Sequence, residues 1–112
     1  MNGTAAYVAL MLRRMAENYL TRTTFRAGPD RSAAVSATGP LGPILADHKG
    51  SINPGPTPGE ITVLLYFSAD GTMAAAAAAI RVIAAAFTDA KKPLPGRLNP
   101  LNVEAFKADP PA

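Results

Sequence analysis

The alternation of apolar and polar positions is clearest between residues 61 and 89. Residues 61–67 read Ile-Thr-Val-Leu-Leu-Tyr-Phe, a run rich in β-branched and aromatic side chains that is largely apolar on both alternating faces. Residues 68–71 have turn composition, and residues 72–89 form an alanine-rich run with helical periodicity. The pattern predicts a strand that leads, with almost no linker, into one long helix carrying the largest apolar surface of the chain.

The predicted helix has a continuous apolar stripe at spacings of three and four residues. Its members are Met73, Ala76, Ala77, Ile80, Ile83, Ala84 and Phe87. The small side chains of residues 74–79 allow another backbone to approach closely. Two interpretations remain open: the stripe packs on the chain's own sheet, or it packs across a two-fold axis against a second copy. Ser68, Asp70 or Thr72 is expected to cap the helix start.

A second alternating pattern begins at Tyr19. Leu20, Arg22, Thr24 and Arg26 alternate with Tyr19, Thr21, Thr23 and Phe25, which predicts a strand with one cationic face. The Gly-Pro-Asp-Arg sequence at residues 28–31 is typical of a turn, so residues 32–38 are expected to return as a weak antiparallel strand.

The segment before this strand fits two periodicities. As a helix, residues 7–20 place Val8, Leu12, Met15 and Tyr19 on one face. As a hairpin, residues 7–12 would pair with residues 19–26 through the polar connection 13–18. Propensity favours the helix, but the pattern does not decide between the two.

Prolines and glycines dominate the middle of the chain. Residues 39–60 contain five of each, which predicts a long contact loop in which residues 44–46 pair briefly at most. Residues 92–112 are expected to form an extended tail, with one short helical turn at residues 102–107. The 112 residues therefore read as a single α+β domain (1–112), an antiparallel sheet of meander type followed by the alanine-rich helix.

Composition narrows the function classes only slightly. A net charge of +3 and a pI near 9.6 favour anionic partners. The chain has no cysteine, which excludes disulfides and thiolate chemistry. No targeting peptide is expected at the N-terminus, and the apolar core of the helix, residues 73–87, is short for a membrane span and contains Arg81. A soluble protein with no small-molecule substrate and no membrane partner is the expectation.

No pattern points to catalysis, a cofactor or a metal. His48 is the only histidine, and a lone loop histidine is most often solvated. A triad of Ser51, His48 and Asp47 would need adjacent loop residues to reach a geometry that they rarely reach. The order Lys49-Gly50-Ser51 inverts that of a phosphate-binding loop. We therefore expect a protein that is not an enzyme and holds neither cofactor nor metal.

The cationic strand face is the best candidate for binding. Arg22 and Arg26 project to the same side with Thr24 between them, and arginine planes both stack on bases and contact phosphates. The alternative is an ordinary solvated face.

The order of these elements resembles that of the coat proteins of single-stranded RNA bacteriophages. The similarity is greatest over residues 60–71 leading into the helix, with Lys-Pro-Leu-Pro at residues 92–95 after it, and as a pattern it covers residues 6–106. The N-terminal hairpin usual in that family has no counterpart before Ala6.

The resemblance implies a virion protein that forms homodimers, assembles into a shell in the bacterial cytoplasm and encloses RNA. It further implies that the helix of one subunit packs on the sheet of its partner, through the seven stripe residues. Arg22, Thr24 and Arg26, with Thr62 and Tyr66 as weaker candidates, would contact RNA. Two alternatives remain: another small phage structural part, such as a decoration, neck or tail protein, or a small basic dimer that regulates by binding nucleic acid.

Overall fold

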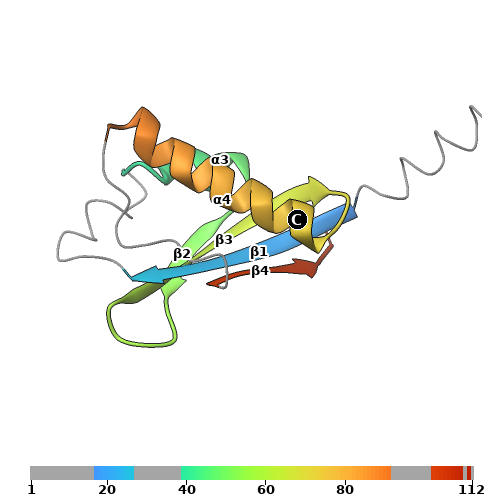
Figure 1. Ribbon diagram of the computed structural model, residues 1–112, viewed down its shortest axis with the longest axis horizontal. Coiled ribbons are helices and arrows are strands. Elements are labelled where there is room, and N and C mark those ends of the chain that lie inside the picture. Colours follow the sequence, from blue (N-terminus) through green and yellow to red (C-terminus); the bar gives the residue numbers. More distant parts are fainter. Residues whose placement is uncertain (1–16, 27–38, 92–101, 110, 112) are drawn as a thin grey trace, which may run out of the picture.

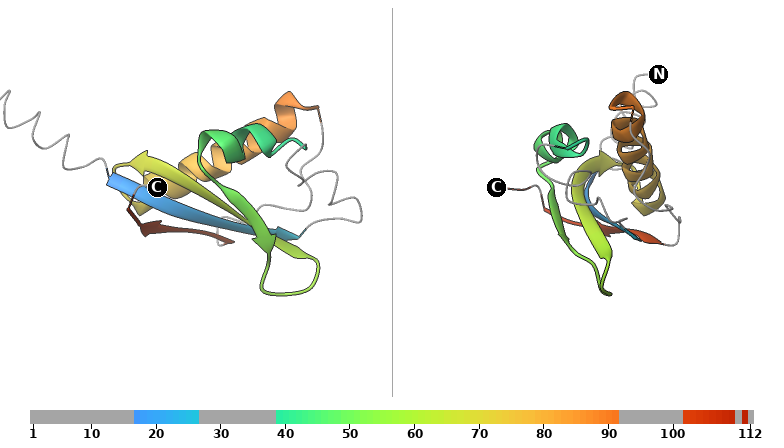
Figure 2. Two further views of the ribbon diagram at one scale, coloured as in Figure 1. Left: turned by 180° about the vertical axis from the view of Figure 1, so that it is seen from behind. Right: turned by 90° about the vertical axis from the view of Figure 1, so that its left-hand side faces the viewer.

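In the computed structural model, the described part of the chain comprises residues 17–26, 39–91, 102–109 and 111. Its elements in chain order are β1 (Glu17–Arg26), α3 (Gly42–Asp47), β2 (Ser51–Pro54), β3 (Glu60–Ala69), α4 (Thr72–Asp89) and β4 (Val103–Lys107). The four strands form one antiparallel sheet in the order β2-β3-β1-β4. Both helices lie on the same side of this sheet (Figures 1 and 2). The predicted α+β class and antiparallel sheet are confirmed.

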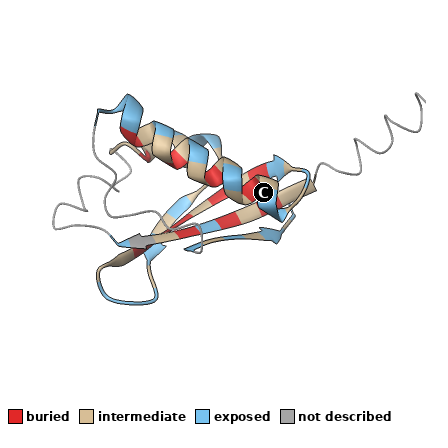
Figure 3. Cartoon of the chain, in the orientation of Figure 1, coloured by how far each residue is buried: buried red, intermediate tan, exposed pale blue. Residues whose placement is uncertain are grey.

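The β3–α4 unit forms as predicted. β3 contains the whole of residues 61–67, and α4 covers residues 72–89. The core joins the two, because Val63 and Leu65 of β3 pack against Ile83 and Phe87 of α4, all fully or almost fully buried. Figure 3 shows the buried positions gathered between helix and sheet. The helix therefore packs on its own sheet.

The face of α4 that enters this core is rotated from the predicted stripe. The buried residues are Ala75, Ala79, Ile83 and Phe87. Of the stripe, Met73 is 86% exposed and Ala77 is exposed, whereas Ala76, Ile80 and Ala84 are partly buried. The alanines do not determine which face of the helix is buried, because none of them is bulky. The packing of Ile83 and Phe87 in the core determines that face.

The start of α4 differs from the expectation. Gly71 occupies the N-cap position with a φ of 145°, and no side chain caps the helix. A positive φ of this size is accessible to glycine without steric cost. The abrupt turn therefore depends on Gly71 rather than on Ser68, Asp70 or Thr72.

β1 is an internal strand. It pairs with β3 along its whole length, and Tyr19 to Thr23 also pair with β4. The predicted helix over residues 7–20 is therefore wrong at Tyr19 and Leu20, which are in a strand. Its residues 7–16 lie outside the described part. The strand predicted to pair with β1, residues 32–38, also lies outside the described part. Over residues 19–23 of β1, both neighbouring positions in the sheet are taken, one by β3 and the other by β4. The sheet of the described strands is thus not a simple meander, since among them only β2 and β3 are neighbours in both sequence and space.

The proline-rich middle is more ordered than predicted. α3 begins with a proline in its first turn, where the missing N–H is not needed, and β2 is an edge strand that ends at Pro54. Leu41, just before α3, is completely buried in the core. A loop prediction for the whole of residues 39–60 is therefore wrong, although no long helix and no central strand occurs there.

The C-terminal prediction is also wrong for residues 103–107, which form the edge strand β4 instead of a helical turn. Val103 packs against the core from this edge. The order of elements therefore ends with a strand that returns to the sheet after α4.

Candidate nucleic-acid interface on the open sheet face

The register of the sheet separates its two faces. Tyr19, Thr21 and Thr23 of β1 and the four buried apolar residues of β3 face the helices. The alternating residues face the other way, and α3 and α4 leave that side uncovered (Figure 2). We call this side the open face. Its central members are Leu20, Arg22, Thr24, Arg26, Thr62, Leu64, Tyr66, Glu104 and Phe106.

All five residues predicted to contact RNA lie on the open face. Leu20 is opposite Tyr66 in the register, and Thr24 is opposite Thr62. Arg22 and Arg26 follow on the same side of β1, and both are exposed. The strand pairing of β1 with β3 therefore brings together residues that are about 40 positions apart in the sequence.

The open face is hollowed near the β2–β3 hairpin. A groove of about 560 Å³ is lined by Arg22, Thr24 and Thr62 of the sheet and by residues 53–56 of the hairpin. Thr62 itself is only 7% exposed, and its hydroxyl lies 3.4 Å from that of Thr24. Thr24 is therefore the more accessible of the two hydroxyls.

Arg22 is held by two neighbours from β4. Its Nη2 donates to Glu104 Oε2 at 2.6 Å, and its guanidinium carbon lies 5.2 Å from the centre of the Phe106 ring. The two side chains of the ion pair are 46% and 53% exposed. The guanidinium plane is thus oriented by an aromatic ring, but Glu104 competes with any phosphate for it.

Acidic residues oppose both arginines across the strands. Glu104 pairs with Arg22, and Glu60 is the register partner of Arg26. The Glu60 carboxylate also accepts hydrogen bonds from the backbone N–H and the hydroxyl of Thr57 in the hairpin loop. Within the described residues, the centre of the open face therefore carries balanced charge rather than a strong positive patch.

Phe106 is the residue that sequence reasoning missed. It is 44% exposed and lies on a row with Leu20 and Tyr66, because Leu20 pairs with both. The signal was present, since in an extended strand Glu104 and Phe106 share one face. The helical interpretation of residues 102–107 concealed it.

His48 is positioned as part of the fold. Its ring stacks near Phe67 with 4.4 Å between centroids, and its Nδ1 lies 2.9 Å from the carbonyl oxygen of Tyr66. This contact directs Nδ1 to the backbone rather than to Asp47, so the triad geometry with Ser51 is not formed. Among the described residues, no three His, Asp or Glu side chains cluster as metal ligands would.

α4 has the length and composition of a membrane-spanning helix, with 18 residues and a mean hydropathy of 1.4. The core helix of a soluble protein passes the same test, and here one face of the helix is buried against the sheet. This property therefore favours neither environment.

No family model, curated protein or solved structure matches the chain.

Proposed function

We propose that the protein is a structural virion subunit that assembles as homodimers into a capsid shell and encloses RNA. The observation that carries the proposal is the convergence of Arg22, Thr24, Arg26 and Tyr66 on a sheet face that α3 and α4 leave uncovered. An antiparallel sheet that is covered on one side alone leaves its other side accessible to solvent or to a partner. In the proposed assembly, this side faces the RNA.

The outer face of α4 supports self-association. Met73 and Ala77 are exposed, and Arg81 is the one charged residue between Thr72 and Thr88. An exposed helix face with so little charge is typical of a surface that meets another protein. The dimer contact proposed from the stripe therefore reduces to Met73, Ala76, Ala77, Ile80 and Ala84, because Ile83 and Phe87 are already buried within the subunit.

The balanced charge of the open face shapes the expected mode of RNA binding. With Glu60 and Glu104 beside the arginines, few phosphates can be neutralised, so stacking on Tyr66, Phe106 and the Arg22 guanidinium provides much of the contact. We therefore expect RNA binding to have a shallow dependence on salt concentration.

The first test is the size of the purified full-length protein, measured by light scattering and electron microscopy before and after nuclease treatment. Closed particles that protect RNA are expected. A species of one or two chains at high concentration, with or without RNA, would rule out the shell. Rings, or binding only to preformed heads, would select another virion part, and discrete complexes on one defined site would select the regulator.

The RNA-binding face is tested by a pair of variants with the same change in charge. Arg26→Gln removes an exposed positive charge from the open face, and Lys91→Gln removes one just after the end of α4. Only Arg26→Gln should lower the amount of RNA in particles or the affinity for single-stranded RNA. Equal losses in both variants would show that net charge, not this face, attracts RNA.

A further inference from the structure

The two edges of the described sheet differ in how open their backbones are. β2 forms one edge and β4 forms the other. At the β2 edge, the N–H of Gly55 donates to the Glu60 carbonyl oxygen. Because backbone groups alternate in direction along a strand, those of Ile52 and Pro54 point away from β3, and Pro54 has no N–H. The β2 edge is therefore poorly suited to pair with a further strand.

β4 has an edge without this protection. The N–H of Ala108 donates to the Asn18 carbonyl oxygen at 2.9 Å. By the same alternation, the backbone groups of Val103, Ala105 and Lys107 point away from β1. Within the described residues, none of these outward N–H and C=O groups has a backbone hydrogen-bond partner. An exposed strand edge of this kind readily pairs with another strand.

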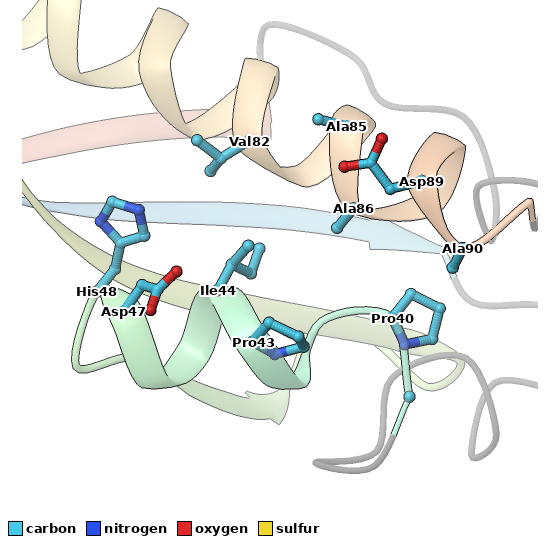
Figure 4. Close-up of a pocket in the computed structure, with 11 residues that line it drawn as sticks. Pro40, Pro43, Ile44, Asp47, His48, Val82, Ala85, Ala86, Asp89 and Ala90 are labelled. Atoms are coloured by element: carbon cyan, nitrogen blue, oxygen red, sulfur yellow. The ribbon is translucent and has the colours of Figure 1, made fainter.

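The helices leave room for a strand beside β4. α4 packs against β4 as well as against β1 and β3. α3 lies on the other flank of α4, toward β2, and the two helices line a cleft there (Figures 2 and 4). A strand added beside β4 would therefore not meet α3, and a helix above that strand would come alongside α4.

The sequence of β4 favours a second copy of β4 as the added strand. Antiparallel pairing about a two-fold axis places one residue opposite its own copy. An axis at Glu104 or Lys107 would oppose like charges, and an axis at Ala105 would place the exposed Phe106 opposite the partner's Glu104. An axis at Phe106 instead pairs the two aromatic rings, which is a favourable cross-strand contact, and places Glu104 opposite the partner's Ala108.

We propose that two copies of the chain join through their β4 strands about a two-fold axis at Phe106, so that their sheets form one continuous antiparallel sheet. The outward groups of Ala105 then bond to those of the partner's Lys107, and the two Phe106 rings pack side by side on the open face. Both open faces lie on the same side of the joined sheet, so the two copies of Arg22 and Tyr66 belong to one surface. This inference rests on the proposed homodimer and specifies its strand contact.

Cysteine substitution in the full-length protein tests the contact, since the chain has no native cysteine. Opposed residues at a non-hydrogen-bonded position have Cα atoms about 4.5 Å apart, a separation that a disulfide spans. Phe106→Cys should therefore form a disulfide-linked dimer under mild oxidation, about tenfold faster than Ser51→Cys, an exposed position on the β2 edge. Glu104→Cys, whose two copies would not face each other, should react as slowly as Ser51→Cys.

Proline substitution provides an independent readout. Because the N–H of Ala105 points outward, Ala105→Pro removes a donor to the partner and none to β1. The variant should weaken dimer formation by about tenfold, measured by light scattering over a dilution series. Its thermal unfolding, followed by circular dichroism at a concentration where the parent is monomeric, should stay close to that of the parent.

The outcomes separate this contact from the proposed homodimer. A parent protein that stays monomeric at all concentrations would rule out the homodimer and the strand contact together. A parent dimer whose Phe106→Cys variant reacts no faster than Ser51→Cys would overturn the strand contact alone. Fastest reaction of Glu104→Cys, or dimers of Ala105→Pro as stable as those of the parent, would contradict pairing about Phe106.

Discussion

Two buried threonines of β1 differ in how their hydroxyls are satisfied. The Thr21 hydroxyl donates to the Leu65 carbonyl oxygen at 3.0 Å, whereas the Thr23 hydroxyl has no hydrogen-bond partner among the described residues. Both side chains are fully buried on the helix side of the sheet. A buried hydroxyl without a partner loses its hydration without compensation.

Replacing each threonine with the isosteric valine should therefore have opposite effects. Thr21→Val should destabilise the protein by about 1 kcal/mol, and Thr23→Val should stabilise it by a similar amount. Urea unfolding of the two variants and the parent measures the difference. A Thr23→Val variant that unfolds at a lower urea concentration than the parent would contradict this assignment of the unpaired hydroxyl.

The ion pair of Arg22 with Glu104 limits the availability of the guanidinium on the open face. Glu104→Gln removes the competing charge, so if RNA binds this face its affinity should rise about fivefold, or ~1 kcal/mol. Each additional phosphate contact should steepen the logarithmic salt dependence by about 0.7 for a single strand. Fluorescence anisotropy with single-stranded RNA over a salt series measures both quantities.

A matched control exists on the other side of the sheet. Glu17→Gln also removes one carboxylate from an exposed ion pair, that with Lys107, but on the helix side. Exposed pairs of this kind contribute about 0–1 kcal/mol, so both variants should stay folded. Equal gains in affinity in the two variants would assign the effect to net charge rather than to Arg22.

At the scale of elements, local patterns were sufficient for β3, for α4 and for residues 19–26 of β1, but not for the other elements. β3 and α4 have clear periodicities and a glycine between them, and no distant partner is needed to recognise them. β4 is different, because its pairing of Glu104 with Arg22 joins residues 82 positions apart. α3 and β2 were obscured by prolines, although each proline occupies a position that its element tolerates.

The same limits apply to the candidate interface. Alternation along β1 and β3 was enough to place Arg22, Thr24, Arg26 and Tyr66 on one face. It could not reveal that Glu104 and Phe106 lie beside them, because a sequence pattern does not specify which strand is the neighbour. The balanced charge of the open face is thus a property of the pairing between β1 and β4.

Gly50 is required where α3 leads into β2. A Cβ at this position would collide with the carbonyl oxygen of Leu64 and lie 2.7 Å from Leu65 Cδ2. Its N–H donates to the Leu45 carbonyl oxygen at 2.8 Å, so the backbone cannot move away without losing a hydrogen bond. The close approach of this connection to β3 therefore depends on the absence of a side chain.

Gly50→Ala should destabilise the protein by about 3 kcal/mol or more, since backbone atoms have to move. Gly59→Ala is the comparison: Gly59 has a φ of 86° with open space around it, so only backbone strain of about 1 kcal/mol is expected. Thermal unfolding followed by circular dichroism measures both. A smaller loss for Gly50→Ala than for Gly59→Ala would contradict the close packing of this turn.

At the scale of the whole molecule, α4 has three distinct faces. Ala75, Ala79, Ile83 and Phe87 are buried against the sheet, and Val82, Ala85 and Ala86 line a cleft between α3 and α4. The third face, around Met73, Ala77 and Arg81, points to solvent in the single subunit. Because alanine fits all of these surroundings, the alanine-rich run in the sequence did not distinguish them.

The outer face is the one that remains for a contact between subunits. A glutamate introduced at exposed Ala77 should leave subunit stability within about 0.5 kcal/mol of the parent, because surface substitutions rarely exceed that. The same charge at a dimer contact would be desolvated, so Ala77→Glu should prevent dimers and particles. Ala79→Glu, at a fully buried position, should instead unfold the subunit itself. Light scattering and circular dichroism on the two variants separate the effects. If Ala77→Glu still assembles like the parent, the contact between subunits lies on another surface than α4.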